Sequence, residues 1–149
     1  MRERVVLVDF YLLVSTITLT IQLVTFALLL IGYNLKRQKR YRQHGLLMVA
    51  AVVLHLISVF AIMIPSFEAI AFTVTNLAQT DIYLAYIHAI LGSIALVLGI
   101  WLTVSWRLRQ GLQYCAPKKR FMLVTFGVWT AAILIGIVLY FLFYMPLMV

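Results

Sequence analysis

Four long apolar stretches, separated by short polar segments, dominate the sequence. A helix needs about 20 mostly apolar residues to cross a hydrocarbon core of roughly 30 Å, and each stretch is long enough. None of them alternates between polar and apolar residues, as the strands of a membrane barrel do. The pattern therefore predicts an all-α integral membrane fold, an antiparallel four-helix bundle that makes a single transmembrane domain of residues 1–149. The expected helices run near residues 10–33, 46–64, 82–106 and 121–145.

Composition favours a lipid environment and argues against nucleic acid. Hydrophobic residues make up 65% of the chain and charged residues 11%, whereas soluble domains average about 45–50% and about 25%. The net charge is +8, and all 12 Lys and Arg residues lie outside the apolar stretches. No basic stripe interleaved with aromatic residues crosses a soluble surface. We therefore expect membrane lipids, and no nucleic acid, as partners.

The basic residues also predict an orientation. Residues 36–42 and 107–120 each contain five Lys or Arg, and basic loops of this kind remain in the cytoplasm. Both termini would then lie on the outer side. The first apolar stretch is too long for a signal peptide and ends in basic residues, so we expect it to remain as a helix. The acidic residues all fall on the outer side in this arrangement: Glu3, Asp9, Glu68 and Asp81.

Polar side chains inside the apolar stretches are the first places to look for a site, because each is costly in lipid without a partner. Ser15, Thr18, Gln22 and Thr25 share one face of the first helix. Such residues commonly bond to neighbouring helices, so we expect packing here, with a transport path as the alternative. No span interior contains Asp, Glu, Lys or Arg. This argues against a proton pump or an ion-coupled transporter.

Three histidines are the strongest candidates for chemistry. His44 stands at the start of the second helix, and His55 lies eleven residues further on, three turns along the same face. Together with His88 they form the candidate set of metal ligands. His44 is distant from the other two, however, and three imidazoles without a nearby carboxylate do not resemble a catalytic zinc site.

His88 stands at the top of a groove of small residues, with Gly92, Ala95 and Gly99 at i+4, i+7 and i+11. Small residues let another helix approach closely, and they also leave room for a flat macrocycle. Because paired histidines on facing helices can hold haem, His55 and His88 are candidate ligands of haem b. Counting the helical rise, their depths differ by about 7 Å, which helix tilt would have to close. The alternative is that each imidazole is simply hydrogen-bonded across the bundle.

Residue patterns typical of catalysis are missing from the sequence. Cys115 is the single cysteine, which excludes an internal disulfide and a cysteine metal cage. The sequence contains no Gly-rich phosphate loop and no recognisable pairing of a nucleophile with a base. The basic residues within 107–120 are expected to meet anionic lipid head groups. We therefore expect a protein without catalytic activity of its own.

Short motifs along the chain match the spacing found in a known family. They read W-x6-G-x3-Y in the last helix, H-x3-M at the start of the second and Y-x4-H in the third. The residues concerned are Gly32, Tyr33, His44, Met48, Tyr83, His88, Trp129, Gly136 and Tyr140. On these residues the chain resembles a family of small four-helix membrane proteins of bacteria and archaea, catalogued as domain of unknown function 420.

The resemblance implies a function, with one departure from the family pattern. Some members of the family are tied to the maturation or activity of haem–copper oxidases. The resemblance therefore implies an accessory or assembly protein of a respiratory complex in a prokaryotic cell membrane, partnered by other membrane subunits, with haem or copper held by histidines. A third family histidine is replaced by Lys118, and His55 is an additional one that could compensate. Two alternatives stay open: a small b-type cytochrome between quinone and a partner, and a purely structural subunit.

Overall fold

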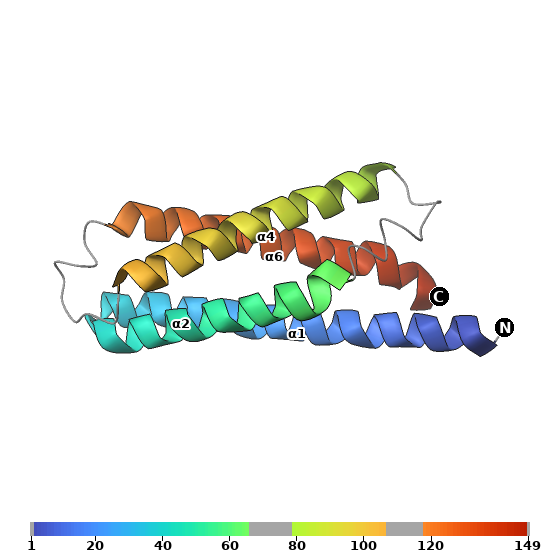
Figure 1. Cartoon of the computed structure of the whole chain (residues 1–149), viewed down its shortest axis with the longest axis horizontal. Helices are drawn as coiled ribbons and strands as arrows, with labels where there is room; N and C mark the ends of the chain where they lie inside the picture. The colour runs from blue at the N-terminus through green and yellow to red at the C-terminus, as the bar shows by residue number, and fades with distance from the viewer. Residues whose placement is uncertain (1, 66–78, 107–117, 149) are drawn as a thin grey trace.

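The computed structural model describes residues 2–65, 79–106 and 118–148 (Figure 1). Side chains are described for residues 12–65, 80–106 and 118–142. Most of residues 65–81, which the predicted orientation places in an outer loop, fall outside these ranges, as do Cys115 and most of the basic segment 107–120. Within them, all regular structure is helical.

Long helices form in all four apolar stretches, as the sequence predicts. They are α1 (Arg2–Arg37), α2 (Tyr41–Ser58), α4 (Gln79–Trp106) and α6 (Lys119–Met148). All four are long and apolar enough to cross a membrane, α2 together with the turn that follows it. α1 begins well before residue 10, because no glycine or proline interrupts the polar segment ahead of the apolar stretch.

A π-helical turn, η1 (Val59–Met63), follows α2 directly. The sequence predicts one uninterrupted helix to residue 64 and gives no sign of this turn. Such turns hold an additional residue and occur frequently at functional sites. Ser58, the last residue before the turn, is fully buried. The turn therefore begins where a polar side chain enters the interior of the bundle.

The helices form a closed ring of neighbours. α1 packs along α2, and α4 packs along α6, while smaller interfaces join α1 to α6 and α2 to α4. The start of α1 and the end of α6 lie at the same end of the bundle (Figure 1). We name this the terminal end. The opposite end, which carries the basic residues 36–42 and 118–120, is the basic end.

A tight turn joins α1 to α2 at the basic end. Lys39 adopts a left-handed conformation with φ 61°. The Arg40 N–H donates to the Leu35 carbonyl at 3.0 Å, and the Lys39 N–H donates to the Lys36 carbonyl at 3.1 Å. This pair of bonds is the Schellman motif that ends many helices. It reverses the chain within three residues, so α1 and α2 are antiparallel neighbours.

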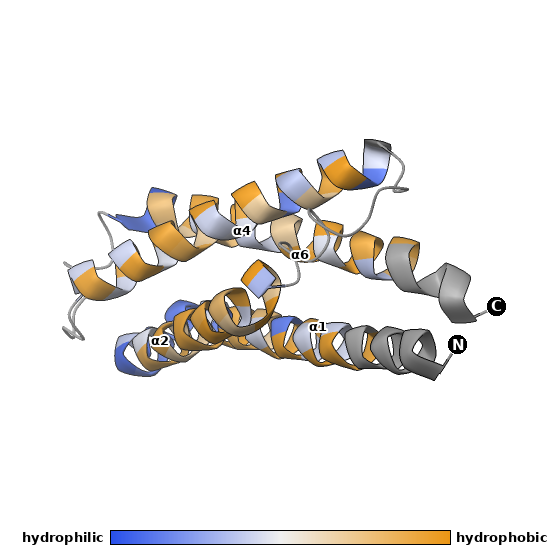
Figure 2. Ribbon diagram, turned by 45° about the vertical axis from the view of Figure 1, so that its right-hand side comes forward, coloured by the Kyte–Doolittle hydropathy of each residue, from blue (hydrophilic) through white to orange (hydrophobic). Residues whose placement is uncertain are grey.

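The helices are mostly apolar along their length (Figure 2), and their exposed side chains are largely hydrophobic, whereas several polar side chains are buried. Val97 and Val104 are 66% and 64% exposed, and large exposed hydrophobic residues occur on all four helices. In water such a surface would drive aggregation. In lipid it carries no penalty, and packing and hydrogen bonds between helices hold the bundle together instead. The buried polar residues are Gln22, Thr25, His44, His55, Ser58 and Thr125.

Candidate histidine site

His55 lies in the interior of the bundle with both ring nitrogens engaged. Its side chain is 2% exposed. Nε2 faces the Gly92 carbonyl at 3.3 Å, so this nitrogen carries the proton and donates it. Gln22 Nε2 donates to the unprotonated His55 Nδ1 at 3.1 Å and to Ser58 Oγ at 3.0 Å. His55 is therefore a neutral imidazole that ties α2 to both α1 and α4.

The polar face expected on the first helix bonds to a neighbouring helix in part. Gln22 bonds across to α2, whereas the hydroxyls of Thr18 and Thr25 donate to carbonyls of their own helix. Gln22 Oε1 is buried and has no partner among the described residues. Ser58 was missed by the sequence analysis. Its position three residues after His55, on the same helix face, was the signal that could have found it.

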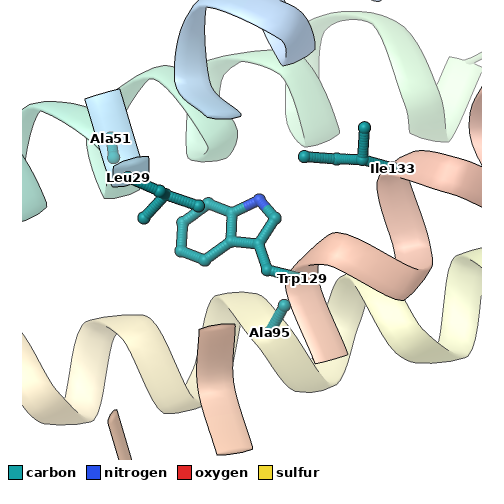
Figure 3. Close-up of a cluster of buried hydrophobic side chains, with 5 residues drawn as sticks. All are labelled: Leu29, Ala51, Ala95, Trp129 and Ile133. Atoms are coloured by element: carbon teal, nitrogen blue, oxygen red, sulfur yellow. The ribbon is translucent and has the colours of Figure 1, made fainter. Parts of the chain in front are cut away.

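Trp129 fills most of the groove predicted along α4. A Cβ placed on Gly99 would lie 3.3 Å from Cζ3 of the indole, and Ala95 is fully buried beside it. At Gly92, by contrast, a Cβ would meet no atom within 4 Å. The predicted groove is thus occupied by a tryptophan of the same chain, except at Gly92. The buried cluster around the indole is Leu29, Ala51, Ala95, Trp129 and Ile133 (Figure 3).

His88 differs from His55 in keeping one nitrogen free. Its Nδ1 lies 2.9 Å from the Ala132 carbonyl, so Nδ1 carries the proton and donates it. Nε2 then holds a lone pair, with no hydrogen bond to any described residue. The ring packs against Gly136, where an added Cβ would lie 2.8 Å from His88 Cε1. A half-buried imidazole is thus held in one orientation by α6.

His44 repeats this arrangement near the basic end. Its Nδ1 donates to the Gly32 carbonyl at 2.8 Å, which leaves Nε2 unprotonated. Met48 lies one turn further along α2, and its sulfur would be 3.8 Å from a Cβ on Gly32. His44 and Met48 therefore both pack on the bare backbone of α1 at Gly32.

The three histidines do not form one metal site. Along α2, His44 and His55 are about 16 Å apart by helical rise. His55 and His88 are nearer, because His55 bonds to Gly92, one turn beyond His88 on α4. Among the described residues, no three His, Cys, Asp or Glu side chains gather around one point.

The predicted haem pair does not fit this arrangement. Each axial histidine must offer iron a free nitrogen lone pair, but both nitrogens of His55 are hydrogen-bonded. The Trp129 ring also lies against the imidazole, with ring centroids 4.8 Å apart and a tilt of 47°. A haem between His55 and His88 would require His55 to leave its partners and Trp129 to move.

The remaining motif residues have separate positions. The Tyr140 hydroxyl and the Thr16 hydroxyl share a hydrogen bond of 2.9 Å between α6 and α1, and Tyr83 is 62% exposed. Trp129 and Gly136, however, contact His55 and His88 respectively.

Comparisons with family models, with curated proteins and with solved structures found no match. The family resemblance therefore stays a prediction that rests on the motifs.

Proposed function

We propose that the bundle spans a prokaryotic cell membrane, with the basic end in the cytoplasm and both termini on the outer side. The support is the exposed apolar surface along all four helices, each long enough to cross a bilayer. Lys and Arg residues gather at one end, where they would meet anionic head groups of the cytoplasmic leaflet.

Within this membrane we propose a non-catalytic accessory or assembly protein of a respiratory complex, which presents haem iron or copper through His88. The observation that carries the proposal is the bond from His88 Nδ1 to the Ala132 carbonyl, which leaves Nε2 free. Metal-ligating histidines almost always donate their other N–H to a carbonyl, a carboxylate or water. Imidazole suits both copper and iron. The link to a respiratory complex comes from the family resemblance.

Among the three histidines, His88 is the best placed ligand. His55 has no free nitrogen. His44 has a free Nε2, but Lys36 lines the same cavity, and its positive charge disfavours a metal cation there. His44 is therefore the second candidate. A single protein imidazole suits a delivery role, because the open coordination positions can be filled by the partner that receives the group.

The test is to purify the protein from membranes and to measure iron, copper and the absorption spectrum, with the activity of the co-expressed oxidase as a second readout. His88→Gln should lose most of the bound metal or haem, since glutamine can still donate to the Ala132 carbonyl but offers no imidazole. His55→Gln should retain it. Absence of metal, haem and co-purifying oxidase subunits from the wild-type protein would contradict the proposal, as would unchanged oxidase activity when all three histidines are replaced.

A further inference from the structure

A cavity of about 90 Å³ lies inside the basic end, between all four helices. Its walls are mostly apolar, with Leu29 from α1, Val52 from α2, Leu102 from α4 and Phe126 from α6. Thr103 and Thr125 also line it, but their hydroxyls donate to carbonyls of their own helices, those of Gly99 and Phe121. Their hydroxyl protons are therefore used within their own helices and not in the cavity. The interior suits a hydrocarbon chain.

The polar groups of this cavity include a lysine between α1 and α6. Lys36 Nζ donates to Met122 Sδ at 3.5 Å. One turn further into the bundle, the rings of Tyr33 and Phe126 stack with centroids 6.1 Å apart. A thioether is a weak acceptor for an ammonium group, and Lys36 forms no ion pair with any residue that the structure describes. Tyr33 and Leu123 line the cavity and are also about half exposed, so the wall of the cavity reaches the surface along this α1–α6 seam.

We propose that this seam binds one anionic phospholipid. The phosphate takes the place of the Met122 sulfur at the Lys36 ammonium, and part of one acyl chain enters the apolar cavity. Charge complementarity selects this occupant, because basic pockets between membrane helices on the cytoplasmic side bind anionic head groups. A copper(I) ion could use His44, Met48 and Met122 as ligands, but the ammonium beside Met122 repels a cation. The inference rests on the proposed membrane insertion and is independent of the proposed metal role.

The test compares lipid retention in matched variants. The full chain is reconstituted in bilayers of equal parts phosphatidylglycerol and phosphatidylcholine, extracted in mild detergent, and analysed by native mass spectrometry. Wild type should retain one phosphatidylglycerol, preferred over phosphatidylcholine by about five-fold, the value of one Lys–head group contact. Lys36→Gln should lose this preference, and Lys36→Arg should keep it. Arg37→Gln is the control, since Arg37 carries the same charge but is exposed and outside the cavity.

A second variant tests the acyl chain without changing charge. Thr125→Leu places an apolar branch in the cavity and should lower retention of both lipids, with the fold checked by circular dichroism. The proposal is wrong if Lys36→Gln still prefers phosphatidylglycerol, or if Arg37→Gln loses the preference as fully as Lys36→Gln. It is also wrong if the protein retains added oleate but no phospholipid, because a fatty acid would then be the occupant. Copper(I) binding that is lost in Met48→Leu and Met122→Leu would likewise overturn the proposal. Failure of the chain to sediment with membranes would instead contradict the proposed insertion.

Discussion

The interior of the bundle has two halves, separated by the indole of Trp129. Toward the terminal end, polar side chains bond between helices: Gln22 to His55, His55 to Gly92, and His88 to Ala132. Toward the basic end, His44 bonds to Gly32 within the α1–α2 hairpin, whereas Thr103 and Thr125 bond within their own helices.

This difference accounts for the cavity in the basic half. In lipid, helices gain little from burying apolar surface, so close packing and interhelical hydrogen bonds decide how near they come. In the terminal half the two hairpins, α1–α2 and α4–α6, are joined by the His55–Gly92 and Thr16–Tyr140 bonds. In the basic half they meet through apolar side chains and the weak Lys36–Met122 contact. Polar residues specify the packing in the terminal half, and apolar residues leave a cavity in the basic half.

The largest expected effect is the loss of the indole that separates the halves. Trp129→Ala removes a side chain that is 2% exposed. Its loss would join the cavity of the basic half to the polar interior of the terminal half. In soluble cores this change costs about 3–5 kcal/mol. Because the unfolded side chain would also lie in lipid, we expect the lower end of that range, about 3 kcal/mol. The loss is measured as the change in the free energy of unfolding, obtained by titrating the protein in mixed detergent micelles with dodecyl sulfate.

Two tryptophan variants serve as controls for this prediction. Trp101 is 46% exposed on α4, so Trp101→Ala should cost well under half as much. Trp129→Phe should be milder than Trp129→Ala, since the buried indole Nε1 has no hydrogen-bond partner among the described residues and only ring volume is lost. Equal losses for Trp101→Ala and Trp129→Ala would show that Trp129 has no special place in the core.

A smaller effect separates two glycines of the terminal half. A Cβ at Gly136 would lie 2.8 Å from His88 Cε1, whereas a Cβ at Gly92 would meet nothing within 4 Å. Gly136→Ala should therefore push the imidazole from the Ala132 carbonyl and cost about 1–2 kcal/mol, as overpacking does. Gly92→Ala should be neutral or slightly stabilising, because alanine favours the helix. The same unfolding titration measures both variants. If Gly92→Ala lowers the free energy of unfolding more than Gly136→Ala does, the groove at Gly92 is filled.

Sequence reasoning was sufficient for the four long helices but not for the π-helical turn or the interior. Apolar length alone predicted the four helices, since a run of that length has few other stable forms in lipid. Helix periodicity placed Gln22 on an inward face, where it does bond to a neighbouring helix. The same periodicity predicted a groove of small residues at Gly92, Ala95 and Gly99, suited to helix packing or to a flat macrocycle. It could not show that Trp129, thirty residues after Gly99, fills most of that groove, because the pairing of helix faces depends on tertiary packing.

The hydrogen-bond partners of each histidine could not be predicted from the sequence either. Spacing put His44 and His55 on one face, but it could not show which ring nitrogens would find partners. Those partners are mainly backbone carbonyls, at Gly32 for His44 and at Gly92 for His55. Every residue has a carbonyl, so no residue type marks such a bond in advance.

The smallest expected effect tests whether the polar half is held by coupled hydrogen bonds. A double-mutant cycle of Gln22→Leu and His55→Leu should give a coupling energy of about 1 kcal/mol, between the average of about 0.6 kcal/mol and the maximum of about 1.7 kcal/mol found for side-chain hydrogen bonds between membrane helices. Each single variant leaves a buried partner unsatisfied, whereas the double variant removes both groups. The double variant should therefore be more stable than the two single losses predict. Unfolding titrations of the four proteins in one detergent mixture give the coupling.

A matched cycle in the other half completes the comparison. Thr103 and Thr125 both line the cavity, but each hydroxyl bonds to its own helix. Thr103→Val and Thr125→Val should therefore show a coupling near zero, because replacing one hydroxyl removes no partner of the other. If the threonine pair couples as strongly as Gln22 and His55, the two halves are held in the same way, and the cavity needs another cause than a shortage of strong hydrogen bonds between the two hairpins.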